Sequence, residues 1–122
     1  MKKILIVEDD NFISEMYANK FSESGFEVKI AKDGQEALDR AKEIIPDLIL
    51  LDIVLPKKDG FEVLNDLKKE KVLKNTKIIF LTNLSEGENI NKGLQSEADA
   101  YLIKAHSTPS QIVAKVKEII KN

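Results

Sequence analysis

Five short apolar runs, each followed by a longer segment with helical periodicity, constrain the fold of this 122-residue chain more than any other feature. The runs are rich in β-branched residues and almost continuously hydrophobic, which is typical of strands buried on both faces of a parallel sheet. They cover residues 4–7, 28–31, 48–53, 77–81 and 100–103. This alternation predicts an α/β fold in which helices pack on both faces of an open, doubly wound sheet.

The segments between the runs place apolar residues three and four positions apart, as amphipathic helices do. The expected apolar faces are Phe12, Ile13, Met16, Tyr17 and Phe21; Ala37, Leu38, Ala41, Ile44 and Ile45; Phe61, Leu64 and Leu67; and Ile112, Val113, Val116, Ile119 and Ile120. Capping boxes occur at Asp33 with Glu36, Asp59 with Glu62, Ser85 with Glu88, and Thr108 with Gln111. The helix expected after Ser85 is the weakest, because Gly93 interrupts it and only Ile90 and Leu94 are large and apolar.

Composition narrows the class of protein. Hydrophobic residues make up 43% of the chain and charged residues 33%, a balance that favours one folded domain over residues 1–122. The net charge of -2 predicts no general attraction to nucleic acids or anionic membranes, and no segment approaches the ~18 apolar residues of a membrane span. The chain has no cysteine, which excludes disulfides and thiolate metal sites, and a cytoplasmic location is expected.

Polar residues stand at the ends of four of the five runs. They are Glu8, Asp9 and Asp10; Asp52; Thr82 and Asn83; and Lys104. In doubly wound sheets the ligand crevice lies outside the carboxyl ends of the strands, so we expect these side chains to meet there. Each has a plain explanation alone, such as a helix cap, a β-forming threonine or a solvated lysine. Asp52 fits these explanations least, because apolar residues flank it on both sides and a lone buried carboxylate is costly.

The chemistry of this set favours phosphoryl transfer. A cluster of carboxylates without His or Cys suits Mg²⁺, which takes one or two carboxylates and keeps several waters. Lys104 and Thr82 would then face an anion, as a positive charge and a hydroxyl donor. Asp52 would be the nucleophile that forms an acyl phosphate.

Four stretches, "ILIVEDD", "DLILLDIVLPKKDG", "IIFLT" and "ADAYLIK", resemble the signature blocks of the receiver domain of bacterial two-component response regulators. The resemblance extends over essentially the whole chain, in the family's order and spacing. It implies a flavodoxin-like, three-layer fold with a five-stranded parallel sheet in the order 2-1-3-4-5. It also implies a signalling switch and not a conventional enzyme. Its partners would be a sensor histidine kinase or phosphotransfer protein, and a downstream protein or an effector domain outside this chain.

The resemblance assigns roles to individual residues. Asp52 resembles the phosphoacceptor, and the expected Mg²⁺ ligands are Glu8, Asp9, Asp52 and the backbone carbonyl of Val54. Of the acids, Asp9 is expected to bind directly and Glu8 through water, while the neighbouring Asp10 leaves open which of the three touches the metal. Thr82 and Lys104 match the phosphoryl-binding pair. Thr82 and Tyr101 match the switch residues, which would act on the surface of the fourth helix, fifth strand and fifth helix.

Two positions depart from the family's usual pattern. Ala105 follows Lys104 where the family usually has a proline after a cis peptide, and we expect a trans peptide because a non-proline cis bond costs about 3–4 kcal/mol. Asn83 stands where the family prefers a very small residue. Val54, Asn83 and Leu84 are expected to border the path of the water that hydrolyses the acyl phosphate. Because Val54 and Leu84 are apolar and cannot orient that water, they predict slow loss of the phosphoryl group.

Three other functions compete with this interpretation. A haloacid-dehalogenase-like phosphatase also uses an aspartyl nucleophile and Mg²⁺, but its D-x-D motif would fall on Glu8-Asp9-Asp10, which lacks the first aspartate. A flavin carrier of the same topology would have a Ser/Thr/Gly-rich loop where this chain reads "EDDNF", which would repel a phosphate. A receiver-like module that is no longer phosphorylated would not need the complete set of acids, threonine and lysine.

Overall fold

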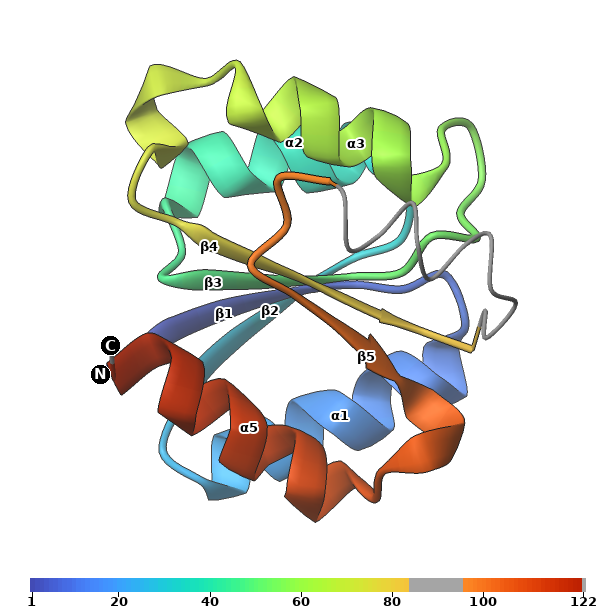
Figure 1. Cartoon of the computed structure of the whole chain (residues 1–122), viewed down its shortest axis with the longest axis vertical. Helices are drawn as coiled ribbons and strands as arrows, with labels where there is room; N and C mark the ends of the chain where they lie inside the picture. Colours follow the sequence, from blue (N-terminus) through green and yellow to red (C-terminus); the bar gives the residue numbers. More distant parts are fainter. Residues whose placement is uncertain (84–95, 122) are drawn as a thin grey trace.

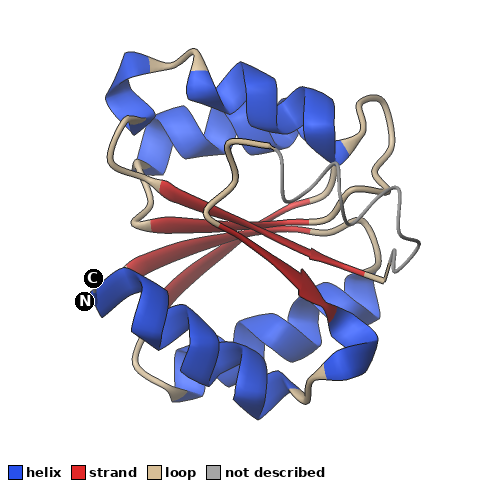
Figure 2. Ribbon diagram, in the orientation of Figure 1, coloured by secondary structure: helices blue, strands red, loops and turns tan. Residues whose placement is uncertain are grey.

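The computed structural model describes residues 1–83 and 96–121, and its centre is a five-stranded parallel sheet. The strands are β1 (Lys3–Val7), β2 (Glu27–Ala31), β3 (Leu48–Leu51), β4 (Lys77–Thr82) and β5 (Ala100–Ile103). Their order across the sheet is β2-β1-β3-β4-β5, and every neighbouring pair is parallel. The predicted three-layer, flavodoxin-like fold class is therefore confirmed, with the sheet between two layers of helices (Figure 2).

Helices cover both faces of the sheet. The described helices are α1 (Asn11–Glu23), α2 (Gly34–Ile44), α3 (Gly60–Lys68) and α5 (Pro109–Lys121), with 3-10 turns η1 (Lys71–Leu73) and η2 (Lys104–His106). α1 and α5 lie on one face, and α2 and α3 lie on the other (Figure 1). The helix expected after Ser85 lies outside the described residues. No helix in the described parts of the chain is long and apolar enough to cross a membrane.

The inner strands β1 and β3 are almost continuously hydrophobic because each of their faces packs against a helical layer, whereas the edge strand β2 carries the charged residues Glu27 and Lys29. In β1, Leu5 and Val7 belong to the core under α2 and α3, whereas Ile4 and Ile6 belong to the core under α1 and α5. The same alternation of side chains occurs in β3. All four residues of β3 are buried, so a polar residue directly after this strand remains close to the protein interior.

Side-chain caps start the helices where the sequence predicts them. Asp33 and Asp59 accept hydrogen bonds from the backbone N–H of the third residue after each of them, at 2.8 and 3.0 Å. Thr108 and Gln111 form a reciprocal capping box with bonds of 2.8 and 3.2 Å. α1 is capped by Asp10, whose Oδ1 accepts the backbone N–H of Ile13 at 2.9 Å. The box expected at Ser85 lies outside the described residues.

Two of the expected apolar faces are narrower than the periodicity indicates. On α1, Tyr17 and Phe21 are buried, but Phe12 is 79% exposed and Met16 is 37% exposed. Phe12 lies in the first turn, beyond the carboxyl end of β1, where strands no longer cover the helix. On α2, Ile45 is not part of the face. It is the C-cap in a left-handed conformation with φ 46°, and it is 48% exposed.

Candidate functional site

The carboxyl ends of the strands surround a cleft of about 280 Å³. It is lined by Glu8, Asp9, Asp10, Ile13, Asp52, Val54, Thr82, Asn83 and Lys104. The structure thus brings together the site residues predicted from strand ends that are far apart in the sequence. Leu84 lies outside the described residues, and Tyr101 does not line the cleft. The sequence places Ile13 only on an apolar helix face; its position in the first turn after Asp10 is the signal that could have identified it as a cleft residue.

Asp52 continues the sheet's hydrogen bonding by one residue beyond the end of β3. β3 ends at Leu51, so the expected strand over 48–53 is two residues too long, and the backbone N–H of Asp52 donates to the carbonyl of Val7 at 3.1 Å. The Asp52 residue is only 8% exposed. Its Oδ1 accepts the backbone N–H of Val54 at 3.3 Å. One oxygen of the carboxylate is therefore held by the chain that follows it.

Gly60 brings the start of α3 directly against the backbone of Asp52. A Cβ at Gly60 would lie 2.5 Å from the carbonyl oxygen of Asp52 and 2.7 Å from the Cα of Ile53, so no larger residue fits without a backbone shift. The Gly60 N–H also donates to the carbonyl of Ile53 at 2.8 Å. The loop between Asp52 and α3 is thereby closed tightly onto the site.

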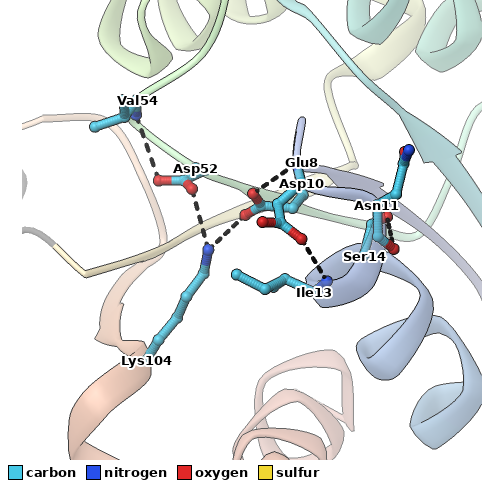
Figure 3. A network of polar contacts seen from close by, with 8 residues as sticks. All are labelled: Glu8, Asp10, Asn11, Ile13, Ser14, Asp52, Val54 and Lys104. Carbon is cyan, nitrogen blue, oxygen red and sulfur yellow. Dashed lines mark hydrogen bonds and ion pairs between the residues drawn. The ribbon is translucent and has the colours of Figure 1, made fainter.

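Lys104 lies between two carboxylates (Figure 3). Its Nζ donates to Oδ2 of Asp52 at 3.0 Å and to Oε2 of Glu8. The side chain of Lys104 is only 10% exposed, and although burial alone would lower its pKa, the bond to Glu8 and the charge of Asp52 raise it overall. Lys104 therefore keeps its positive charge inside the cleft.

The three acids after β1 lie in different environments. Glu8 is 5% exposed, and burial, followed by its hydrogen bond with Asp52, raises its pKa to about 7 although Lys104 acts in the opposite direction. Its Oε1 also accepts the backbone N–H of Asp10 at 3.1 Å. Asp10 uses its own carboxylate to cap α1, and Asp9 is exposed where it lines the cleft. Glu8 is the buried acid of the three, and Asp9 and Asp10 form the rim.

The residues of the cleft fit Mg²⁺ by their chemistry. The available donors are carboxylate and carbonyl oxygens, which Mg²⁺ prefers, and the cleft has room for the waters that this ion retains. In the described residues no three acidic, histidine or cysteine side chains gather closely enough to hold a metal by themselves. Instead, the Lys104 ammonium pairs with both Glu8 and Asp52, so its single positive charge offsets at most one of the two carboxylates. Asp9, Asp52 and the Val54 carbonyl remain the donors that would hold the ion, with waters completing the shell.

Thr82 and Tyr101 lie on the neighbouring strands β4 and β5. Thr82 is the last residue of β4, is 1% exposed and lines the cleft. Tyr101 lies in β5 opposite Phe80, and the centroids of the two rings are 5.9 Å apart. The Tyr101 ring packs on the core under α2 and α3, and burial followed by the charge of Asp52 raises its pKa. The two residues predicted to form the switch are thus on adjacent strands but not directly opposite each other, because Thr82 pairs with Ile103.

The Lys104–Ala105 peptide is trans, as predicted, and the described residues contain no cis peptide bond. After β5 the chain enters the 3-10 turn η2, which begins at Lys104 itself. The ammonium nevertheless reaches both carboxylates.

Comparison with known proteins places this fold and site in a family. The sequence matches the response regulator receiver domain over residues 4–117, and the chain belongs to that family. It is 40% identical to the alkaline phosphatase synthesis transcriptional regulatory protein PhoP of Bacillus subtilis, over 98% of this chain and 49% of that protein. It is 35% identical to the phosphate regulon transcriptional regulatory protein PhoB of Escherichia coli, over 98% of this chain and 52% of that protein.

Solved structures of other response regulator proteins have the same fold. The receiver domain of the Francisella response regulator 1452 superposes with a TM-score of 0.89 at 33% identity, covering 99% of this chain and 98% of that one. The Vibrio cholerae chemotaxis protein CheY4 gives 0.89 at 29% identity, covering 98% of each chain.

Family membership excludes two of the three competing functions, and a receiver-like module that is no longer phosphorylated remains an alternative. The protein is a receiver of two-component signal transduction, a signalling module and not a conventional enzyme, so the phosphatase and flavin-carrier interpretations are wrong. Receiver domains of this family typically bind Mg²⁺. The chain spans about half the length of the curated relatives it matches.

Proposed function

We propose that Asp52 accepts a phosphoryl group from a sensor histidine kinase or phosphotransfer protein, and that this unit, residues 1–122, acts as a phosphorylation-dependent switch. The observation that carries the proposal is the position of Asp52. Its carboxylate is buried at the carboxyl edge of the sheet, with one oxygen on the Val54 N–H and the other on Lys104. A nucleophile held in this way needs little reorganisation before an in-line displacement.

Six of the nine cleft residues would take part in the transfer. A carboxylate oxygen of Asp52 forms the new O–P bond while the bond between phosphorus and the donor breaks. Lys104, already 3.0 Å from Asp52 Oδ2, is placed to pair with a phosphoryl oxygen, and the Thr82 hydroxyl is the second donor to that group. When bound, Mg²⁺ supplies positive charge to the phosphoryl oxygens. Asp9, Asp52 and the Val54 carbonyl would hold it, with Glu8 acting through water.

The readout would pass from Thr82 to Tyr101. A phosphoryl group on Asp52 would draw the Thr82 hydroxyl toward it, and Tyr101 would turn further into the space next to β4. Tyr101 already packs against Phe80 of that strand, so a small rotation changes the surface of β5 and its neighbours. The output would be a downstream protein or an effector domain that reads the surface of the fourth helix, β5 and α5.

Phosphorylation by a small donor tests the proposal. Wild type incubated with acetyl phosphate and Mg²⁺ should gain one acid-stable, base-labile phosphoryl group by intact-protein mass spectrometry. Asp52→Asn should gain none, and chelation of Mg²⁺ should abolish the gain in wild type. Asp39→Asn, which removes the same charge from the exposed side of α2, is the matched control and should be modified normally. Equal modification of wild type and Asp52→Asn would rule out the assignment.

Hydrogen exchange tests the readout separately. With a beryllofluoride mimic and Mg²⁺, exchange should change over residues 85–101. A change confined to residues 28–45 would show that the signal leaves the site by another route.

A further inference from the structure

The loop that follows Asp52 is anchored to two helices by lysine side chains. Lys57 Nζ lies 3.3 Å from Oδ2 of Asp33, the N-cap of α2, and Lys58 Nζ lies 2.7 Å from Oδ2 of Asp66 in α3. The loop also packs closely on the first residue of α2, since a Cβ at Gly34 would lie 3.0 Å from the Cβ of Lys58. The loop is therefore attached to α2 and to α3 through residues that do not line the cleft.

Lys57 has an unusual backbone conformation at this anchor. Its φ is 70°, in the left-handed region that non-glycine residues seldom adopt. The N–H of Lys58 donates to the carbonyl of Pro56 at 2.8 Å, so the chain turns around Lys57 within three residues. A lysine offers no intrinsic advantage over glycine in such a turn. What the lysine adds here is its side chain, which spans to Asp33.

Asp33 has two tasks that use different oxygens. Its Oδ1 accepts the Glu36 N–H at 2.8 Å and caps α2, while its Oδ2 faces Lys57. The side chain of Asp33 is 19% exposed and that of Lys57 is 67% exposed. The bond from Glu36 and, less strongly, Lys57 hold the pKa of Asp33 below its usual range. The acid therefore stays ionised as the partner of the more exposed lysine.

We propose that Lys57, paired with Asp33, is a positioning residue that holds the loop of Val54 in place for binding of Mg²⁺ in the cleft. The inference rests on the proposed function, in which the Val54 carbonyl is a metal donor. Val54 is three residues from Lys57, and its N–H already bonds to Asp52. Anchoring the far end of the loop reduces the conformational freedom that Val54 would lose on binding, which favours the bound state.

Charge alone predicts the opposite effect, and this makes the proposal testable. Lys57 is a cation near an acidic cleft, so its removal should tighten Mg²⁺ binding if it acted only through space. If Lys57 acts by positioning the loop, Lys57→Gln should weaken binding instead. An exposed ion pair contributes little, so the expected weakening is about threefold at low salt. It should shrink at high salt, where exposed pairs are screened.

The experiment compares Mg²⁺ affinities of purified proteins by calorimetric titration. Lys57→Gln should bind about threefold more weakly than wild type, and Lys57→Arg, which can still reach Asp33, should restore affinity. Asn caps helices as well as Asp does, so Asp33→Asn removes the pair while keeping the cap. In that background Lys57→Gln should cause no further weakening. Lys42→Gln, which breaks the ion pair between Lys42 of α2 and Glu70 at the start of η1, is the control for loss of one charge.

A second readout separates positioning from stability. In Lys57→Gln without metal, the Val54 amide should exchange faster while the midpoint of urea unfolding stays within the range of the Lys42→Gln control. Unchanged or tighter Mg²⁺ binding by Lys57→Gln would overturn the positioning role and leave the proposed function intact. Failure of wild type itself to bind Mg²⁺ would overturn both.

Discussion

Replacing Asp52 with asparagine should lower the pKa of Glu8 and make the protein less sensitive to rising pH in the absence of divalent ions. In wild type, burial and then the hydrogen bond with Asp52 raise the pKa of Glu8 from 4.5 to about 7. The asparagine side chain carries no charge and can donate its amide to Glu8, while Lys104 remains to stabilise the ionised form. The pKa of Glu8 should therefore move back toward its usual value, with burial preventing a full return.

The magnitude follows from proton linkage. Because the folded-state pKa of this acid is raised, the unfolded chain loses its proton first. Glu8 therefore costs no stability below pH 4.5, reduces the free energy of unfolding as pH rises to about 7, and changes nothing further above that. The rise of the pKa from 4.5 to about 7 corresponds to a loss of about 3 kcal/mol of stability. Burial, the largest cause, remains in the variant, so removal of Asp52 should recover only part of this stability, about 1 kcal/mol.

Carbon-13 NMR titration of the Glu8 carboxyl gives the pKa directly. Urea unfolding in the presence of a chelator gives the stabilities of Asp52→Asn and wild type at about pH 5 and about pH 8. The difference between the two proteins should grow by about 1 kcal/mol in favour of the variant at the higher pH. Loss of the Lys104–Asp52 attraction adds an offset that is similar at both pH values. In Asp39→Asn, the matched control, the difference should stay constant. A pKa of Glu8 that is the same in Asp52→Asn and wild type would refute the reasoning.

Three further predictions concern the backbone and the lifetime of the phosphorylated form. Ile45→Gly should raise the free energy of unfolding by about 0.5–1 kcal/mol, because Ile45 has a strained φ of 46° and a half-exposed side chain. If urea unfolding shows that the variant is less stable than wild type, the backbone strain assigned to Ile45 is contradicted. Gly60→Ala should lower stability by about 2 kcal/mol or more, since the Asp52 carbonyl must move, and the same assay measures it. Val54→Asn combined with Leu84→Glu should speed dephosphorylation by about tenfold or more, as measured by the rate at which radiolabelled phosphate is lost from the protein. A double variant that loses phosphate no faster than wild type would show that these side chains do not control the attacking water.

Much of the fold is determined by patterns within a few residues. The β-branched runs mark the strands most clearly where helices cover both faces of the sheet, as for β1 and β3, because such a strand has no solvent-exposed face on which polar side chains could lie. The caps of α2, α3 and α5 follow from pairs three residues apart, such as Asp33 with Glu36, since both partners lie in one helical turn. The strand ends could be placed well enough to predict which polar residues share an edge, because parallel strands all end on the same side.

The tertiary structure decides how much of each pattern is buried. Periodicity shows that Phe12 and Tyr17 can share a face of α1, but only the packing of that helix leaves Phe12 in solvent and buries Tyr17. The same holds for Ile45, which continues the α2 pattern although the chain has already left the helix in a left-handed turn before Pro46. The 3.6-residue period determines which side chains point in the same direction from a helix. It does not determine how much of that helix face is covered by the rest of the protein.

In the site, too, the sequence predicts which residues meet, whereas the tertiary structure decides how they pair. From the sequence, acids and a lysine at strand ends predict a common cleft, and the apolar residues around Asp52 single it out. That Lys104 pairs with Glu8 as well as Asp52, and that Lys57 reaches the cap of α2, follows from contacts between residues 96, 52 and 24 positions apart. Such distances depend on how the strands and loops are packed together, because side chains that are remote in the chain meet only where the backbone brings them within a few ångströms.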